Sequence, residues 1–421
     1  MGSLDLSEQE RARRDIAAVL PGRDHDLTRL RVLAEGGIPI VTVIGKYNHG
    51  KSRLLNELLG HDAFAVADRR ETVALSECER DGVRWLDAPG IDADVGVEDD
   101  RHAMQAAWLQ SDIRLFVHAA KEGELDAQER ALLGELRADA GRTRRKTLFV
   151  LSQVDQLADE AELDKVIDAL QSQLPDLKPI PVSATRHRLG VQEGKRLMFE
   201  RSGFPRLRDE LATSLSGVQM ARAHETALLL GEILAELQAL HSRHKAALAE
   251  SRARQRQQRL AFVQGLEGVF ARIGANIRAV VDAPGPDHAQ TADSAEDHYR
   301  QTAAKLERAR IQVAYSRACI ELDGFLAGHG VVELPSAQRT GARAMDSVMV
   351  AVMGVSVKRR SDLRRMFCDG AGIERLHQDF LHYFELSKDR IELAGAIAVA
   401  EAEVATVENA LDALHALVPV A

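Results

Sequence analysis

One short segment restricts the fold of this chain more than any other feature. It matches the pattern GxxxxGK[ST] and consists of Gly45, Lys46, Tyr47, Asn48, His49, Gly50, Lys51 and Ser52. A run of β-branched residues, Ile38 to Ile44, precedes it, and an amphipathic helical pattern follows it. The segment is therefore predicted to join a buried strand to a helix, a connection typical of α/β folds with a parallel sheet.

The position of this loop predicts its ligand. Backbone N–H groups and the positive end of a helix dipole meet where a glycine-rich loop opens a helix, and both suit a phosphate. Lys51 is expected to reach the β- and γ-phosphates, and the Ser52 hydroxyl to bind Mg²⁺. His49 is expected to contact solvent. The remaining residues predicted to line the phosphates are Gly45, Lys46, Tyr47, Asn48, Gly50 and Arg53. The structural alternative is a glycine turn with a surface lysine.

A second motif follows the loop after one predicted hairpin. Asp87, in the segment Trp85 to Gly90, ends a strand-like run and can hold Mg²⁺ through water, while the Gly90 N–H can meet the γ-phosphate. The pattern DxxG is weak alone, but both motifs are expected at the carboxyl ends of adjacent strands. Between them, Thr72 is the candidate for a threonine that closes over Mg²⁺, and it also fits an ordinary residue at the start of a strand. Predicted catalytic residues are Lys51, Asn48, Thr72 and Gly90.

The same alternation of strand-like and helix-like segments continues to about Leu215. Further strands are predicted at Val83 to Leu86, Ile113 to Ala119, Thr147 to Leu151 and Ile180 to Val182. The turn Arg80-Asp81-Gly82 predicts a hairpin with one antiparallel edge strand. We therefore expect residues 36–216 to form an α/β domain with a mostly parallel sheet and helices on both faces.

The second half of the chain has helical periodicity. Apolar residues alternate at spacings of three and four from Leu230 to Val280 and again from Leu393 to Leu414. Residues 217–421 are expected to form an elongated all-α helical bundle. Residues 1–35, with a break near Pro21, are expected to be a helical segment that packs with the bundle.

The order of these motifs resembles that of small GTPases of the TrmE/Era type and of bacterial dynamin-like proteins, over about residues 37–215. In those families a base-recognition motif N/T-K-x-D and an S-A-K/L loop follow the later strands. This chain has Ser152-Gln153-Val154-Asp155 and Ser183-Ala184-Thr185 there. The resemblance implies GTP or GDP with Mg²⁺ as ligands, and Asp155 as the acceptor of guanine hydrogens. Gln153, Ser183 and Ala184 are the other base-side candidates.

Two departures from that pattern affect the predicted chemistry. Gln153 replaces the usual lysine and Ser152 replaces Asn or Thr, which predicts weaker base affinity and selectivity; Asp155 also suits a helix cap. Ile91 occupies the place where Ras-like enzymes have a water-orienting glutamine. By resemblance to TrmE-type enzymes, Asn48 is a candidate to hold K⁺ beside the phosphates, and dimerisation across the nucleotide face is expected. The alternative for Asn48 is a residue that suits a tight loop.

The composition of the chain indicates which kinds of partner and which cellular location to expect. The net charge of −9 argues against a nucleic-acid partner, and three separated cysteines indicate a reducing cytosol. From the charged N-terminus and the lack of any run of 18 apolar residues, we expect neither a secretory signal nor a membrane span. The expected location is the cytoplasm or the inner face of the membrane.

Two functions remain open for the helical half. In the first, the chain forms homodimers or larger assemblies that move the bundle as a stalk against an anionic membrane. A related GTPase is a further candidate partner. Ser347 to Val357, an apolar run followed by five basic residues, is the candidate tip, and a buried bundle helix is its alternative. In the second, the chain is a TrmE/Era-type assembly or RNA-related GTPase. A nucleotide-switched scaffold with little turnover is a third option.

Overall fold

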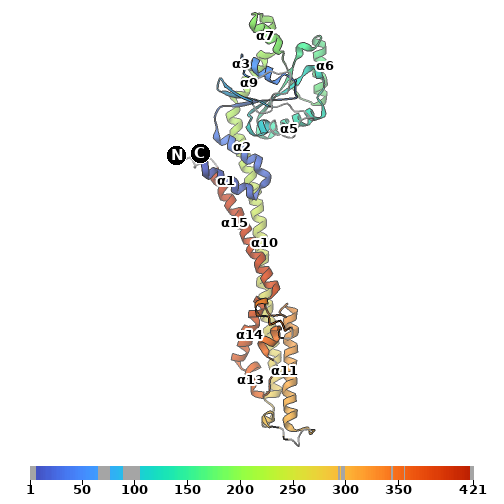
Figure 1. Ribbon diagram of the computed structural model, residues 1–421, viewed down its shortest axis with the longest axis vertical. Helices are drawn as coiled ribbons and strands as arrows, with labels where there is room; N and C mark the ends of the chain where they lie inside the picture. Colours follow the sequence, from blue (N-terminus) through green and yellow to red (C-terminus); the bar gives the residue numbers. More distant parts are fainter. Residues whose placement is uncertain are drawn as a thin grey trace. The chain divides into compact units, whose positions relative to one another are not determined.

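The computed structural model describes residues 6–64, 76–88, 105–292, 294, 299–342, 345–354 and 356–417. The chain forms two compact units (Figure 1). Residues 1–238 and 409–421 make up the first unit, and residues 239–408 make up the second. Helices α10 (Val218–Val281) and α15 (Lys388–Leu417) contribute residues to both.

The first unit is built on a six-stranded sheet with the strand order β2-β3-β1-β4-β5-β6. The strands are β1 (Ile40–Ile44), β2 (Ser76–Arg80), β3 (Val83–Asp87), β4 (Ile113–Ala119), β5 (Lys146–Ser152) and β6 (Ile180–Pro181). Only the edge pair β2 and β3 is antiparallel among these pairings. The predicted α/β fold with a mostly parallel sheet is confirmed.

The antiparallel edge follows from its turn. Asp81 and Gly82 both have positive φ angles, 53° and 71°, and connect β2 directly to β3. Two consecutive residues with positive φ form the turn whose twist matches a two-stranded ribbon, and Asp-Gly is a preferred pair for it. The hairpin is therefore as predicted from residue 76 onward, whereas residues 65–75 lie outside the described part of the chain.

Helices cover both faces of the sheet (Figure 1). One face packs against α3 (Lys51–Leu59) and α9 (Phe204–Ser216), and the other packs against α5 (Ala127–Thr143) and α6 (Glu160–Gln173). Strand β4 shows the alternation, because Leu115 and Val117 belong to the first core and Phe116 belongs to the second. Two short helices, α7 (Ala184–Gln192) and α8 (Arg196–Glu200), lie between β6 and α9 in the chain.

The N-terminal helices also belong to the first unit. They are α1 (Leu6–Val19) and α2 (Asp24–Glu35), separated by a 3₁₀ turn, Pro21–Arg23. Arg29 of α2 pairs with Glu225 of α10 at 2.8 Å and with Asp112 at 3.3 Å. Both predicted domain boundaries, 35/36 and 216/217, therefore lie inside this unit, and the division into domains stays a prediction.

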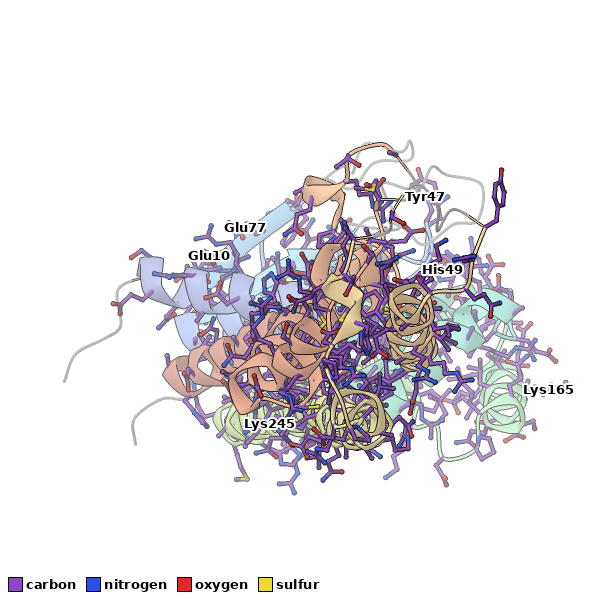
Figure 2. The ribbon with its side chains drawn as sticks, turned by 90° about the horizontal axis from the view of Figure 1, so that it is seen from below. Glu10, Tyr47, His49, Glu77, Lys165 and Lys245 are labelled. Atoms are coloured by element: carbon purple, nitrogen blue, oxygen red, sulfur yellow. The ribbon has the colours of Figure 1, made fainter. Side chains whose placement is uncertain are left out.

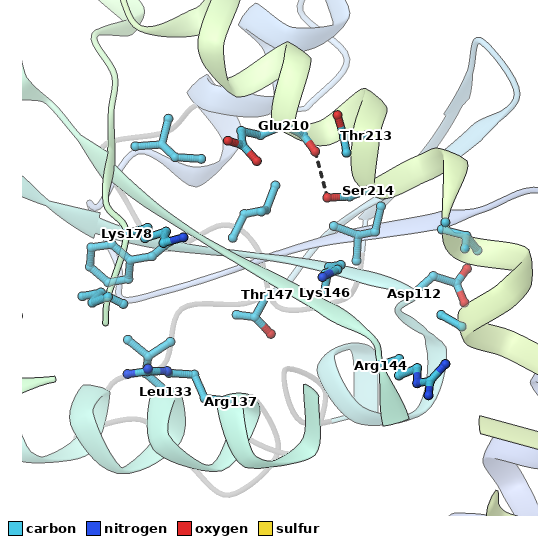
Figure 3. Close-up of a pocket in the computed structure, with 18 of the residues that line it drawn as sticks. Asp112, Leu133, Arg137, Arg144, Lys146, Thr147, Lys178, Glu210, Thr213 and Ser214 are labelled. Atoms are coloured by element: carbon cyan, nitrogen blue, oxygen red, sulfur yellow. Dashed lines mark hydrogen bonds between the residues drawn. The ribbon is translucent and has the colours of Figure 1, made fainter. Parts of the chain in front are cut away.

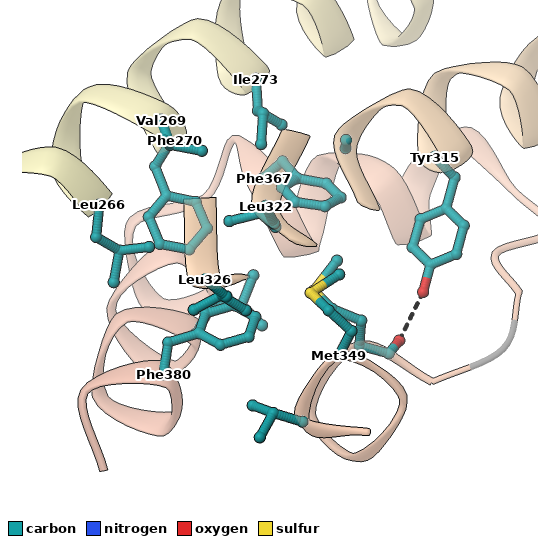
Figure 4. Close-up of a cluster of buried hydrophobic side chains, with 14 of the residues drawn as sticks. Leu266, Val269, Phe270, Ile273, Tyr315, Leu322, Leu326, Met349, Phe367 and Phe380 are labelled. Atoms are coloured by element: carbon teal, nitrogen blue, oxygen red, sulfur yellow. Dashed lines mark hydrogen bonds between the residues drawn. The ribbon is translucent and has the colours of Figure 1, made fainter. Parts of the chain in front are cut away.

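The second unit is helical and has its own core. It contains α11 (Ala303–Gly328), α12 (Val348–Met353), α13 (Arg360–Phe367) and α14 (Gly370–Glu385) with parts of α10 and α15. Aromatic rings lie at the centre of this core, where Phe262 stacks on Phe384 with ring centroids 4.2 Å apart. Figure 4 shows Phe270, Phe367 and Phe380 in the same cluster. The predicted helical region is confirmed.

The apolar run Ser347 to Val357 belongs to this core. Val348, Met349 and Met353 are buried, and Tyr315 donates a hydrogen bond to the Met353 carbonyl at 2.8 Å. A membrane contact through these side chains is therefore wrong, because they already pack against α11 and α14, and the buried-helix alternative holds. None of the helices in the described part of the chain combines the length and the apolar character needed to cross a bilayer.

The basic residues after this run are partly neutralised. Arg360 contacts Glu307 at 2.6 Å, and Arg364 contacts Asp282 at 2.5 Å. Carboxylate pairing reduces the charge that these arginines could offer to anionic headgroups.

Candidate nucleotide-binding site

The loop between β1 and α3 passes very close to the neighbouring strand. A side chain at Gly45 would place its Cβ 2.2 Å from the Val117 carbonyl oxygen, and the φ angle of Gly45 is 156°. Gly50, the residue before α3, has φ 81°. Glycine is required at Gly45 for space and is favoured at Gly50 by its left-handed backbone conformation. The P-loop (residues 45–52) therefore lies across the carboxyl ends of β1 and β4, as the motif predicts.

Three of the predicted residues meet where α3 begins. The Ser52 hydroxyl donates to Asp87 Oδ2 at 2.5 Å, and Lys51 Nζ donates to the Lys46 carbonyl at 2.9 Å. Asp87 is 2% exposed, and its Oδ1 has no hydrogen-bond partner among the described residues. Burial raises the pKa of Asp87, opposed by the Ser52 hydrogen bond and the Lys51 charge. A hydroxyl beside a buried carboxylate with an unused oxygen is a donor set that suits Mg²⁺.

The side of the P-loop that faces β4 and α5 is polar. This feature was not predicted from the sequence. His49 is 3% exposed, and its Nδ1 lies 3.2 Å from the Val117 carbonyl and 3.6 Å from Glu129 Oε1. The same carboxylate oxygen lies 2.9 Å from His118 Nδ1. Burial lowers the pKa of His49 to about 4. The expectation that His49 contacts solvent is therefore wrong, because β4 and α5 surround its ring.

Ligand-type atoms of His49, His118 and Glu129 lie within 4.8 Å of one another. Both ring nitrogens of His118 face acceptors, Glu129 Oε1 at 2.9 Å and the Gly123 carbonyl at 3.3 Å. The cluster is thus accounted for by hydrogen bonds that hold the P-loop on β4 and α5.

A second contact joins the P-loop to the start of α5. Lys46 forms an ion pair with Asp126, the residue that caps α5. Asp126 accepts from the Glu129 N–H at 2.8 Å, and Glu129 accepts from the Asp126 N–H at 3.2 Å, which completes a capping box. Both capping residues therefore contact the P-loop, Asp126 through Lys46 and Glu129 through His49.

The predicted base-recognition residues lie beside the P-loop. Ser152 Oγ donates to the His49 carbonyl at 2.6 Å, and Gln153 Nε2 donates to the Asn48 carbonyl at 2.6 Å. Asn48 and Gln153 each have φ 59°, a left-handed conformation that Asn adopts more readily than most residues. This backbone requirement gives Asn48 a structural reason that is independent of any ion.

Of the remaining candidate residues, some lie in the described part of the chain and two lie outside it. Asp155 is half-buried in the 3₁₀ turn Val154–Gln156, and Ser183 caps α7 by accepting from the Arg186 N–H at 3.0 Å. Tyr47 and His49 are marked in Figure 2. Ala184, Tyr47 and Arg53 are partly buried. Thr72 and Gly90 lie outside the described residues, so their predicted roles stay predictions, as do the roles of all other site residues.

Comparison with known proteins defines the class. Residues 40–153 match the family of 50S ribosome-binding GTPases. GTPase Der of Clostridium perfringens is 32% identical over 128 residues, which span 28% of this chain and 28% of that protein. The fold, the P-loop geometry and the family match define a P-loop GTPase domain. The predicted class is confirmed.

The whole chain has a close relative. This chain is 46% identical over 401 residues to an uncharacterized protein of Acinetobacter baylyi, and the match covers 95% of this chain and 96% of that protein. This chain belongs to the same family as that protein. Among solved structures, Era of Aquifex aeolicus bound to GDP·AlF₄⁻ is 22% identical, covering 38% of this chain and 56% of that one, with a TM-score of 0.31. A chain of an oligomerised bacterial dynamin pair is 11% identical, covering 98% and 95%, with a TM-score of 0.44.

Proposed function

We propose that this protein hydrolyses GTP in a magnesium-dependent reaction and that GTP-bound chains dimerise through their GTPase domains. The observation that carries the proposal is the convergence of Lys51, Ser52 and Asp87 at the start of α3. These groups are a cation, a hydroxyl and a buried carboxylate, the set that phosphoryl transfer requires for charge neutralisation.

Each residue has a distinct part in this reaction. Lys51 would exchange the Lys46 carbonyl for phosphate oxygens, which gives a stronger, charge-assisted hydrogen bond. Ser52 and Asp87 would hold Mg²⁺, which supplies positive charge at the phosphates when bound. The backbone N–H groups of the P-loop would bind the phosphates at the N-terminus of α3.

The remaining parts of the proposal concern base selection and the attacking water. Asp155 is the proposed guanine acceptor, while Gln153 is hydrogen-bonded to the P-loop and ties the base-recognition segment to the phosphate site. Ile91 cannot orient water through a hydrogen bond. We propose that K⁺ held at Asn48 contributes charge instead, as the resemblance to TrmE-type enzymes implies.

Membrane action through a helical stalk is the accompanying proposal. It requires a surface other than the buried run Ser347 to Val357. The alternatives, an assembly or RNA-related GTPase and a scaffold with little turnover, differ from it in partner and in rate.

The decisive experiment measures GTP turnover per molecule against protein concentration, in K⁺ and in Na⁺ buffer, with and without anionic liposomes. The variant is Lys51→Ala, and the matched control is Lys165→Ala, an exposed lysine on α6. Binding of a fluorescent guanine nucleotide by the control but not by Lys51→Ala is expected. A rate that rises with concentration supports dimerisation, and equal rates in Na⁺ and K⁺ would remove the role of Asn48. Absence of guanine nucleotide binding by the unmodified chain would refute the proposal.

A further inference from the structure

Apart from the nucleotide site, the first unit has a cavity at the end of the sheet opposite the P-loop. Figure 3 shows residues that line this cavity. Its volume is about 380 Å³. It is lined by residues at the amino ends of β4 and β5, where Ile113 is paired with Lys146, and by residues of α5, α9 and the first turn of α10. The P-loop, in contrast, follows the carboxyl end of β1, so the two sites are separated by the length of the strands.

The walls combine an apolar floor with a basic rim. Apolar side chains of the floor include those of Ile113, Leu133, Leu148, Phe149 and Ile180. Five basic residues line the same cavity: Arg137, Arg144, Lys146, Lys178 and Arg206. None of these five forms an ion pair with a carboxylate of the residues that the structure describes. Figure 3 shows four of them around the cavity.

Three acidic residues also line the cavity and offset the charge of the five basic residues only in part. Asp112 is buried and bonded to Arg222 at 2.5 Å. Asp176 and Glu210 are exposed and form no ion pair with the described residues. The surplus of positive charge is local, because the chain as a whole has 64 acidic and 55 basic residues.

Elsewhere in the same unit, the buried side chains of Arg29 and Arg114 pair with carboxylates. Arg29 contacts Glu225 at 2.8 Å, and Arg114 contacts Asp139 at 2.5 Å. Five cations without a carboxylate partner lie around one concave surface and repel one another, and because four of them are exposed, solvent weakens this repulsion. An anion from outside the chain would relieve that repulsion.

A polar atom in the wall also lacks a partner. The Thr147 hydroxyl oxygen is buried and has no hydrogen-bond partner among the described residues. It lies on β5 between Lys146 and the apolar Leu148, two other residues of the cavity wall.

We propose that this cavity binds a phosphate-bearing organic anion, separately from GTP. Guanidinium groups of Arg144 and Arg206 would bind phosphate oxygens in pairs. Arg137, which donates to the Pro175 carbonyl at 3.0 Å, and the lysines would add charge. The apolar floor would contact the non-polar part of the ligand, and the volume falls within the range of small-molecule sites. The end of α9 and the start of α10, from Thr213 to Val218, complete the wall.

The phosphate can come from a soluble metabolite or from a phospholipid headgroup, and one experiment separates the two. The full chain is saturated with GDP and Mg²⁺ so that phosphate probes do not enter the P-loop. Glycerol 3-phosphate is titrated by calorimetry. Vesicles of phosphatidylglycerol in phosphatidylcholine, and of phosphatidylcholine alone, are used in co-sedimentation.

The test variant is Arg144→Gln with Lys178→Gln. The matched control is Lys165→Gln with Arg201→Gln, which removes the same charge at two exposed residues outside the cavity. Affinity is expected to fall about tenfold or more in the test variant, because two charge-assisted contacts are lost, and to be unchanged in the control. The midpoint of thermal unfolding of the test variant without ligand is expected not to fall, since like-charge repulsion decreases.

Each outcome decides the proposal. Binding of glycerol 3-phosphate that the test variant loses supports a soluble ligand. Binding only of phosphatidylglycerol vesicles, lost in the same way, supports a headgroup. The proposal is overturned if the unmodified chain binds neither probe, or if the test and control variants lose affinity equally. GTP turnover is measured on the same purified proteins before GDP is added, so a failure here is distinguishable from a failure of the proposed GTPase activity.

Discussion

His49 is predicted to make the stability of the first unit depend on pH. Burial lowers its pKa in the folded chain to about 4, whereas the ordinary pKa of a histidine side chain is 6.5. The unfolded chain therefore binds a proton at His49 at higher pH than the folded chain does. Stability from this residue is fully present above about pH 6.5 and is lost as pH falls toward 4.

The magnitude follows from the two pKa values. At about 1.4 kcal/mol per pKa unit, the complete loss approaches about 3 kcal/mol, and about 2 kcal/mol of it falls between pH 7 and pH 5. The change that isolates the effect is His49→Gln, because the glutamine amide cannot titrate and can still donate to the Val117 carbonyl, which accepts from His49 at 3.2 Å. The difference between the unmodified chain and the variant removes the contribution of titrating groups that do not interact with His49, and leaves that of His49 with its neighbours Glu129 and His118.

Urea unfolding followed by tryptophan fluorescence measures this difference. Both tryptophans, Trp85 and Trp108, lie in the first unit, so the signal reports that unit. The free energy of unfolding is expected to fall by about 2 kcal/mol more for the unmodified chain than for the variant between pH 7 and pH 5. Parallel pH profiles for the two proteins would show that His49 titrates normally and would refute the reasoning.

Three further predictions follow from named contacts. Asp87→Asn should lower magnesium-dependent GTP turnover at least about a hundredfold, measured by phosphate release, because the Mg²⁺ site loses its charge; a normal rate would contradict the assigned role. Gly45→Ala should abolish binding of a fluorescent guanine nucleotide, because its Cβ would lie 2.2 Å from the Val117 carbonyl oxygen. Asp139→Asn should destabilise the first unit by about 3–5 kcal/mol in the urea assay, since it removes the carboxylate that lies 2.5 Å from the buried Arg114; a loss below about 1 kcal/mol would contradict this.

Much of the fold could be predicted from local patterns. The P-loop, the Asp81-Gly82 turn and the strand at 113–119 were all assigned from residues within a few positions of one another. Such features follow from backbone conformation and from short-range hydrophobic periodicity, and both can be inferred directly from neighbouring residues in the sequence. The meeting of Ser52 with Asp87 was also predictable, because both motifs end at the carboxyl edge of adjacent parallel strands.

Other features could not be inferred from neighbouring residues. His118 and Glu129 are 69 and 80 positions from His49, and only the placement of β4 beside β1 brings them under the P-loop. One signal was present in the sequence, since His118 is polar within an otherwise largely apolar strand. Its meaning depended on what the neighbouring helix supplied.

The sequence by itself determined the phosphate-binding loop, the mostly parallel sheet and the helical second half, because each is set by local conformational preferences and the period of apolar residues. Tertiary structure alone decided that Val348 and Met353 are core residues and that His49 is buried. It also decided that five cations from β5, α5, α9 and the intervening loops surround one cavity. The physical reason is that burial and charge pairing depend on which distant segments pack together, and that packing is fixed only when the strands take their order in the sheet and the helices cover it.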